Sequence, residues 1–361
     1  MPVSKPAYRL SLGSTTFTSG APAESGDLLG AAVAAVTGAV GTGAATAGPT
    51  LLALRVDSDL EAPGSLDAWF GNASGLSVAT GDAVRVDLGY GTSLSTVFVG
   101  SVESIEPHLA DVRVRALTAD AKLCRVRLNQ VYENQAAGQI VSDLAAQAGL
   151  STGPMQSGLD LPSYVVDDGR TAYRHCRELA ERVGFDMYVA ADGVLTFAAF
   201  DKVSADHEFT YARDVLSLQV SSLPPMYEAV EVWGESPASA EGLEAASWLV
   251  RDFSGSVGSA GSGATLRLSD PAVRTRDAAG ASARGRLAAL ARRSTFGVAV
   301  LLGYPDVVLG DAVSFADVPD ERLNELFQVK RVTHTFAKSN GFTTRLELWG
   351  AGGGSALGGL L

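Results

Sequence analysis

Cysteine and positive charge are both scarce in this chain of 361 residues. Its two cysteines, Cys124 and Cys176, cannot build a disulfide framework, so we expect two buried thiols in a reducing compartment. Lys and Arg number 28 against 40 Asp and Glu, which gives a formal net charge of −12. Because phosphate contacts require clustered Lys and Arg, this balance argues against direct nucleic-acid binding.

A long, strongly apolar segment is also lacking. Residues 28–48 carry no charge over a length that could cross a membrane, but most of them are Ala, Gly and Thr. They are too weakly apolar for stable insertion, and we expect a surface insertion or a loop at a subunit contact rather than a membrane span. Residues 1–10 lack the apolar core of a secretory signal, so we expect no signal peptide and production in the cytoplasm.

Residues with catalytic or metal-binding potential are isolated from one another. No two of the four histidines have the spacing of metal ligands. His175 and Cys176 are adjacent in a predicted helix, where their side chains point about 100° apart and cannot form a nucleophile–base pair. Asp167 and Asp168 precede that helix, a position where carboxylates more often stabilise the N-terminus than act as acid and base. The histidines are His108, His175, His207 and His334.

Two glycine-rich stretches also fail as nucleotide-binding motifs. Residues 258–265 have the glycine spacing of a phosphate loop but carry Ala264 where the lysine must stand, so we interpret them as a flexible loop. The stretch that begins at Gly41 lacks the third glycine of a dinucleotide fingerprint. We therefore predict no catalytic, cofactor-binding or metal site, and we expect His334 to be a hydrogen-bonded strand residue. The chain is not expected to be an enzyme.

Strand patterns dominate the chain, and its 40 glycines suit many short strands and tight turns. Alternating apolar residues predict strands near 8–12, 51–56, 84–88 and 96–102. Helical spacing predicts a helix from Gln135 to Ala148, with Asn134 as its N-cap, and a second one from Thr171 to Val183. A third helix is predicted from Ala278 to Arg293, with one side formed by Leu287, Leu290 and Ala291.

The clearest pattern lies in residues 303–350. Asn340-Gly341 separates two alternating runs, and this dipeptide suits a type I′ hairpin turn. After the turn, the period of two places Phe342, Thr344, Leu346 and Leu348 on one face of the strand. The predicted organisation is a first β-barrel in 1–123, an α/β module in 124–204, a second β-barrel in 205–234 and 295–350, an insertion with a helix in 235–294, and a glycine-rich tail in 351–361.

The closing segments GYPDVVLGDAVSF, LFQVKRVTHTF and GFTTRLELWG resemble the last meander of the baseplate hub proteins of contractile phage tails and related injection systems, the late-control D-type hubs. Three more segments fit that family in order. They are residues 97–102 with 112–123, which include Asp120; the first helix, which ends in Ala148-Gly149-Leu150; and the second helix with 184–189 and 192–197. Together they cover roughly two thirds of the chain, although the resemblance does not explain residues 28–48.

The resemblance implies a mainly β fold with an α+β insertion: two tail-tube-like antiparallel β-barrels and a small α/β module. It also implies a homotrimer in which three chains form a pseudo-sixfold ring, with a hexameric inner tube above, a trimeric spike protein below and other baseplate proteins around it. The protein would then be a structural part of the baseplate of a phage tail-like particle. Whether that particle is a phage, a tailocin or an injection system stays open.

Two alternatives also stay open. A tail-tube subunit would need one barrel and hexameric symmetry. A β-rich hydrolase would be favoured if the fold brought His334 or His175 within reach of a carboxylate.

Overall fold

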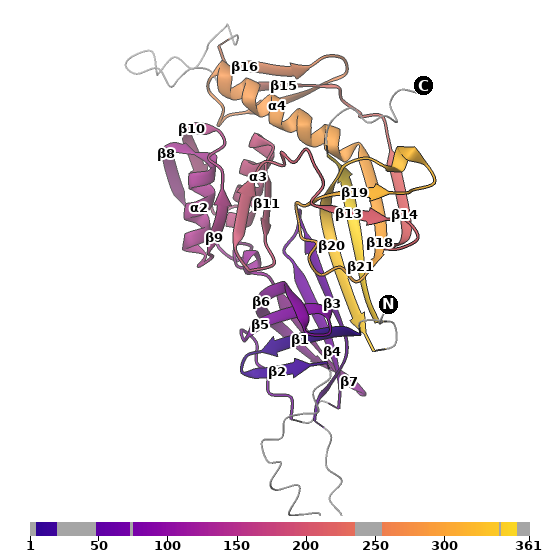
Figure 1. Cartoon of the computed structure of the whole chain (residues 1–361). Helices are drawn as coiled ribbons and strands as arrows, with labels where there is room; N and C mark the ends of the chain where they lie inside the picture. The colour runs from indigo at the N-terminus through magenta and orange to yellow at the C-terminus, as the bar shows by residue number, and fades with distance from the viewer. Residues whose placement is uncertain (1–4, 20–47, 73–74, 235–254, 339–340, 352–361) are drawn as a thin grey trace, which may run out of the picture.

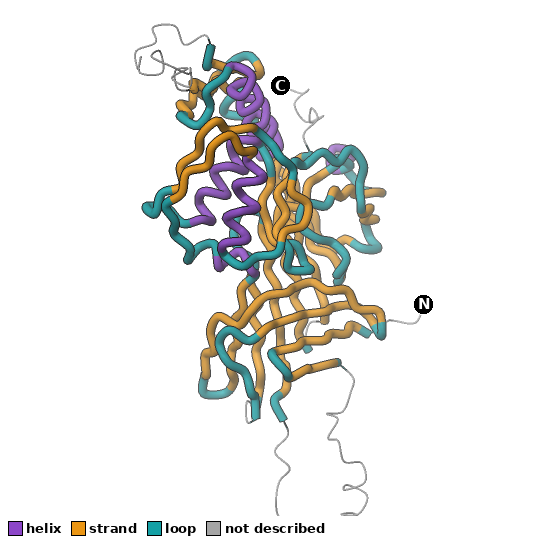
Figure 2. Tube along the Cα trace, turned by 90° about the vertical axis from the view of Figure 1, so that its left-hand side faces the viewer, coloured by secondary structure: helices purple, strands orange, loops and turns teal. Residues whose placement is uncertain are grey.

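The computed structural model describes residues 5–19, 48–72, 75–234, 255–338 and 341–351. The fold is mainly β, as predicted. One thirteen-stranded sheet runs through two β-regions. The first lies at the bottom of Figure 1, and the second lies above it on the right-hand side of the picture. The α/β module lies beside this sheet, and a smaller sheet covered by the longest described helix lies at the top (Figures 1 and 2). In the described ranges, no helix is long and apolar enough to cross a membrane.

The first β-region is an antiparallel meander around an apolar core. Along β4 and the first half of β5, buried side chains alternate with more exposed ones, as the period of two requires. The turn after Tyr90 is a two-residue hairpin, in which Gly91 adopts a φ of 60°. The strands are β1 (Pro6–Leu12), β2 (Thr15–Thr18), β3 (Thr50–Asp59), β4 (Ser65–Gly71), β5 (Ala83–Tyr90), β6 (Ser93–Pro107) and β7 (Asp111–Leu117).

The second β-region ends in the predicted closing hairpin. Phe342, Thr344, Leu346 and Leu348 are all buried on one face of its last strand, which confirms the predicted register. Asn340 lies outside the described residues, so the turn type stays a prediction. The strands are β13 (His207–Thr210), β14 (Val215–Ser222), β18 (Thr295–Leu302), β19 (Ala312–Ala316), β20 (Phe327–Ala337) and β21 (Gly341–Gly350), with a short helix η3 (Glu321–Leu323) before β20.

The two β-regions share a single sheet instead of forming two separate barrels. Strand β20 pairs with β21 on one side and with β3 on the other, from Arg331 opposite Asp59 to Ala337 opposite Ala53. Phe336 and Phe342, at the far end of the hairpin, belong to the core of the first β-region. The sheet does not close on itself: among the described strands, its main path ends at β14 and β2, and a short branch of β19 and β13 leaves it at β20.

The α/β module packs two helices on short strands around one core. Helix α3 (Ala172–Val183) matches the prediction: the Thr171 side chain caps its N-terminus, and Gly184 ends it with a φ of 74°. Helix α2 (Ala137–Gln147) starts later than predicted, because residues up to Ala136 pair with another strand; Asn134 is therefore a strand residue and not the N-cap. The other elements are η1 (Ala119–Lys122), β8 (Gln130–Ala136), β9 (Thr152–Met155), β10 (Asp160–Val166), β11 (Asp186–Val189) and β12 (Leu195–Ala198).

The insertion combines a three-stranded sheet, β15 (Ala229–Gly234), β16 (Val257–Gly261) and β17 (Thr265–Asp270), with helix α4 (Arg276–Arg293). Two interpretations of this part are corrected. Strand β15, which was assigned to the second barrel, pairs only with β16 and β17 among the described strands. Residues 258–265 form most of a strand and a turn instead of a flexible loop.

The buried face of α4 also differs from the prediction. It consists of small residues, with Ala279 and Ala283 fully buried, whereas Leu287 and Leu290 are only partly buried and Ala291 is exposed. Residues 28–47, for which a surface insertion was expected, and the glycine-rich residues 352–361 lie outside the described residues.

Candidate functional site

His175 lies close to a carboxylate, the arrangement that a hydrolase would need. Its Nε2 is 3.8 Å from Asp167 Oδ2 and 3.1 Å from the Asp167 carbonyl oxygen, and its Nδ1 is 3.1 Å from Tyr164 Oη. The imidazole is fully buried, however, and both of its nitrogens have protein partners. Cys176 is also fully buried, and burial raises the pKa of its thiol to about 12. Cys124 is exposed, so the expectation of two buried thiols was wrong for that residue. A fully buried imidazole and a thiol that stays protonated are typical of core residues rather than of a catalytic site.

His334 is a buried strand residue, as expected. Its Nδ1 is 3.0 Å from Thr344 Oγ1 on the neighbouring strand, and burial lowers the pKa of the imidazole to about 4. The cavity that it borders has a volume of about 10 Å³, which is enough for no more than about one water molecule. The site therefore has no room for a substrate.

His207 forms the best-aligned histidine–carboxylate pair, although the sequence did not single it out. Its Nε2 is 3.2 Å from Asp311 Oδ2, and Lys202 Nζ is 3.2 Å from the other oxygen of the same carboxylate. The Val308 amide donates to Asp311 as well, so the carboxylate holds β13 against the segment before β19. His108 is exposed in a turn. Within the described ranges, no group of three or more His, Cys, Asp or Glu could hold a metal ion.

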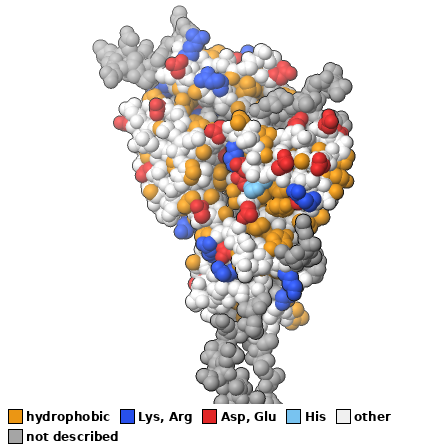
Figure 3. All heavy atoms as spheres, in the orientation of Figure 1, with side chains coloured by type: hydrophobic (Ala, Val, Ile, Leu, Met, Phe, Trp, Pro, Cys, Tyr) orange, Lys and Arg blue, Asp and Glu red, His pale blue; other side chains and the backbone are white. Residues whose placement is uncertain are grey.

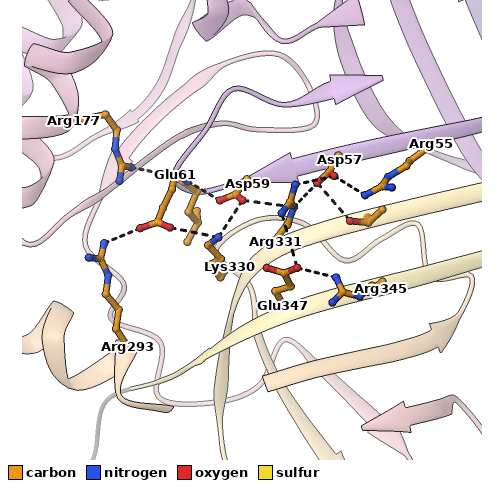
Figure 4. Close-up of polar contacts among 12 residues, drawn as sticks. Arg55, Asp57, Asp59, Glu61, Arg177, Arg293, Lys330, Arg331, Arg345 and Glu347 are labelled. Carbon is orange, nitrogen blue, oxygen red and sulfur yellow. Dashed lines mark hydrogen bonds and ion pairs between the residues drawn. The ribbon is translucent and has the colours of Figure 1, made fainter. Parts of the chain in front are cut away.

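A ladder of charged residues crosses the junction of the two β-regions (Figure 4). Arg331 binds Asp57 through two hydrogen bonds of 2.6 and 3.0 Å, and Lys330 is 3.1 Å from Asp59. Glu61 is 3.4 Å from Lys330 and 3.1 Å from Arg293 of α4, so the ladder extends to the insertion. Because these charges form a connected, partly buried network, they contribute more than isolated surface pairs. The ladder escaped sequence reasoning because Asp57 and Arg331 are 274 positions apart.

An exposed apolar surface surrounds strand β14, one end of the large sheet. Edge strands present unpaired backbone groups, and soluble proteins seldom leave them beside large exposed hydrophobic side chains. Figure 3 shows hydrophobic side chains gathered over the second β-region, on the right-hand side of the molecule. The exposed side chains on and beside β14 and its neighbour β18 are Tyr211, Leu216, Leu223, Met226, Phe296 and Leu302, which we call the β14 surface. This surface is the strongest candidate for a functional site in the described part of the chain.

The opposite end of the sheet has a different character. Strand β2 contains only four residues, Thr15–Thr18, and three of them are threonines. The two ends are therefore unlike, one apolar and one short and polar. An isologous contact would pair the β14 edge with its own copy, whereas a head-to-tail contact would join it to a different surface of the next copy.

Comparison with solved structures shows which known proteins share this fold. No family model matches the sequence, and no curated protein matches it either. The 43 kDa tail protein of prophage MuSo2 from Shewanella oneidensis superposes with a TM-score of 0.67 at 13% identity, over 96% of this chain and 99% of that one. The fold is that of phage tail proteins. A tail protein from Neisseria meningitidis MC58 agrees, with a TM-score of 0.66, 13% identity and 96% of each chain covered.

A third solved structure extends the likeness to secretion machinery. It is a component of the type VI secretion system of E. coli, itself similar to the bacteriophage T4 tail proteins gp27 and gp5. Its TM-score is 0.56 at 12% identity, over 84% of this chain and 74% of that one. The tail-protein fold spans both β-regions, the module and the insertion, because the first two superpositions cover nearly the whole chain.

Proposed function

We propose that this chain is a structural component of a phage tail-like particle, and more specifically its baseplate hub. In this role, three copies form a ring that joins the hexameric inner tube above to a trimeric spike protein below, with other baseplate proteins around it. The whole-length likeness to tail proteins supports the tail assignment, and the closing hairpin sequence supports the hub. The protein would be made in the cytoplasm of the producing cell and then assembled into the baseplate.

The observation that carries this proposal is the open sheet whose β14 edge is surrounded by exposed apolar side chains. Each chain supplies two β-regions within one sheet, so three chains present six such regions around an axis. A head-to-tail contact through the β14 surface covers the apolar edge, and a rotation that closes after three copies leaves no β14 surface exposed. The formal net charge of −12 suits a channel through which cargo must slide without binding.

The proposal is tested by native mass spectrometry and electron microscopy of the purified chain, alone and with its spike and tube partners. We expect three copies around the axis. Six copies per ring would instead identify a tail-tube subunit, and a two-fold interface would contradict both assignments.

Two matched variants test the role of the β14 surface. Leu216→Lys places a charge on the exposed edge strand and should abolish the ring while leaving the monomer folded, as checked by circular dichroism. Leu109→Lys changes a leucine that is even more exposed, in the turn after β6, and should leave the ring intact. Rings of unchanged stability in Leu216→Lys would exclude this surface as the contact.

A further inference from the structure

A cavity of about 180 Å³ lies where all four parts of the molecule meet. Its walls come from α3 and the turn after it, from β17 and α4 of the insertion, from the residues that follow β3, and from Trp349 at the end of β21. Leu60 and Trp349 also belong to the core of the second β-region. The volume exceeds that of a cavity able to hold a benzene ring, about 150 Å³. One aromatic or branched aliphatic side chain therefore fits in it.

The charges around this cavity differ in sign from those of the chain as a whole. Four arginines line it against three carboxylates, in a protein with a formal net charge of −12. Two of the carboxylates are already engaged, because Glu61 pairs with Arg293 at 3.1 Å and Asp186 lies 3.5 Å from Arg292. The lining arginines are Arg177, Arg286, Arg292 and Arg293, and the third carboxylate is Glu181.

Two of these arginines are incompletely compensated. Arg177 donates to the neutral carbonyl oxygen of Leu60 at 2.6 Å, and it shares the charge of Asp186 with Arg292 and Arg293. Arg286 has long contacts of 3.5 Å to Asp270, which it shares with Arg182, and 3.4 Å to Ser282. Glu181 adds a weaker opposite charge, and burial still lowers the pKa of the Arg286 guanidinium. A carboxylate that entered the cavity would compensate both charges, since charge-assisted hydrogen bonds are about twice as strong as neutral ones.

The rest of the wall is apolar. Phe185, Leu266, Leu268 and Leu290 line the cavity together with Trp349. Figure 4 shows two of the lining arginines, Arg177 and Arg293, on the same side of Glu61. A site that combines an apolar wall with cationic groups matches a ligand that has an apolar body and an anionic group.

We propose that this cavity binds a peptide segment of another protein in which an aspartate or glutamate stands beside a leucine or an aromatic residue. The apolar side chain fills the cavity, and the carboxylate pairs with Arg177 and Arg286. This site shares no residue with the β14 surface, although its Trp349 pairs with Phe296 of that surface, and the proposal does not depend on the number of copies in the ring. Because the four parts of the molecule all contribute to the walls, the bound segment also fixes their relative positions.

The test is a selection of a random heptapeptide library on the purified full chain, followed by calorimetric titration of the enriched peptides. Enriched peptides should pair an acidic residue with Leu, Phe or Trp and bind with a dissociation constant on the order of 0.1 mM or tighter. Replacement of their acidic residue by its amide should weaken binding about tenfold. No enrichment, or enrichment without acidic residues, would overturn the proposal.

Matched variants locate the site. Ala289 lines the cavity, whereas its neighbour Ala288 is exposed and does not, so Ala289→Phe should abolish binding and Ala288→Phe should leave it unchanged. Arg177→Gln should weaken binding of the acidic peptide about three- to tenfold and leave binding of its amide form unchanged. The control Arg174→Gln, on an exposed part of the same helix, should leave binding of both peptides unchanged. Equal binding by the Ala289→Phe and Ala288→Phe chains, with unchanged melting temperatures, would place the peptide elsewhere and refute the assignment.

Discussion

Gly184 and Gly285 pack backbone against backbone where the α/β module meets the insertion. A β-carbon on Gly184 would lie 2.5 Å from the Cα of Gly285, and one on Gly285 would lie 2.4 Å from the carbonyl oxygen of Val183. Gly184 ends α3 in the left-handed region, and Gly285 lies in the middle of α4. The two glycines thus set the approach of the two helices.

Gly285→Ala should therefore destabilise the protein, even though alanine is the better helix former. The added methyl group has to displace backbone, and overpacking of this kind costs about 1–3 kcal/mol. Urea unfolding gives the difference. Gly280→Ala, in the same helix, is the control, because its β-carbon would meet only Arg284 Nη1 at 3.4 Å. It should stabilise by up to about 1 kcal/mol, and equal effects of the two changes would contradict the packing argument.

Arg182 and Asp270 form the buried polar link across the same junction. Arg182 Nε and Nη2 donate to the two carboxylate oxygens of Asp270 at 2.6 and 2.9 Å, and both side chains are nearly excluded from solvent. Asp270→Asn leaves a buried guanidinium without its counter-charge and should lower the free energy of unfolding by about 3–5 kcal/mol. The exposed pair of Arg267 and Glu231 is the comparison: Glu231→Gln should change stability by less than about 1 kcal/mol.

The His207–Asp311 pair should make stability depend on pH near neutrality. The hydrogen bond to Asp311 raises the pKa of His207 above its ordinary value of 6.5 in the folded state. The folded state then holds the proton more tightly than the unfolded chain. The contribution of the pair to the free energy of unfolding is fully present below pH 6.5 and is lost as the pH rises through the raised pKa of His207. Unfolding of His207→Gln should show a smaller loss of stability than the unchanged protein between about pH 6 and about pH 8.

His334 should act in the opposite direction. Burial lowers the pKa of its imidazole from 6.5 to about 4, so the unfolded chain takes up this proton at a higher pH than the folded state does. Stability is lost as the pH falls from 6.5 toward 4, by about 3 kcal/mol over the full range. His334→Asn should flatten that part of the stability profile, and an unchanged profile would show that the imidazole is solvated.

One other group that titrates in the same pH range requires a control in this experiment. Burial raises the pKa of Asp120 to about 6, so its contribution falls as the pH rises from 3.8 to 6, which opposes that of His334. The profile of His334→Asn should accordingly be measured in both the native background and Asp120→Asn.

Local patterns predicted the elements whose signals lie within a few neighbouring residues. The register of β21 followed from its period of two, and α3 followed from its apolar spacing, with Thr171 and Gly184 at its ends. The late start of α2 was missed because pairing of β8 with β10 competes with the helix, and Asn134 takes a φ of 51° inside that strand. The start of α2 is therefore set by the pairing of β8 with β10 and not by the local helix signal.

Distant relationships could not be predicted from the sequence. Leucines suggested one face for α4, but the helix lies so close to β16 that a β-carbon on Gly258 would be 2.0 Å from the amide nitrogen of Gly280. Only small residues fit there, so the buried face of α4 is formed by alanines such as Ala279 and Ala283 and not by the leucines. The β3–β20 contact and its ion pairs join residues about 270 positions apart, and no local period reports such a pairing.

The shared hairpin also determines when the protein can fold during its synthesis. The core of the first β-region needs Phe336 and Phe342, which pack on Tyr8 and Tyr90 with ring centres 5.0 and 6.0 Å apart. Strand β3 is therefore synthesised roughly 270 residues before its partner strand β20, and it stays unpaired on that side in the meantime. The nascent chain keeps one side of its earliest sheet unpaired until β20 and β21 emerge, so neither β-region can be complete before that point.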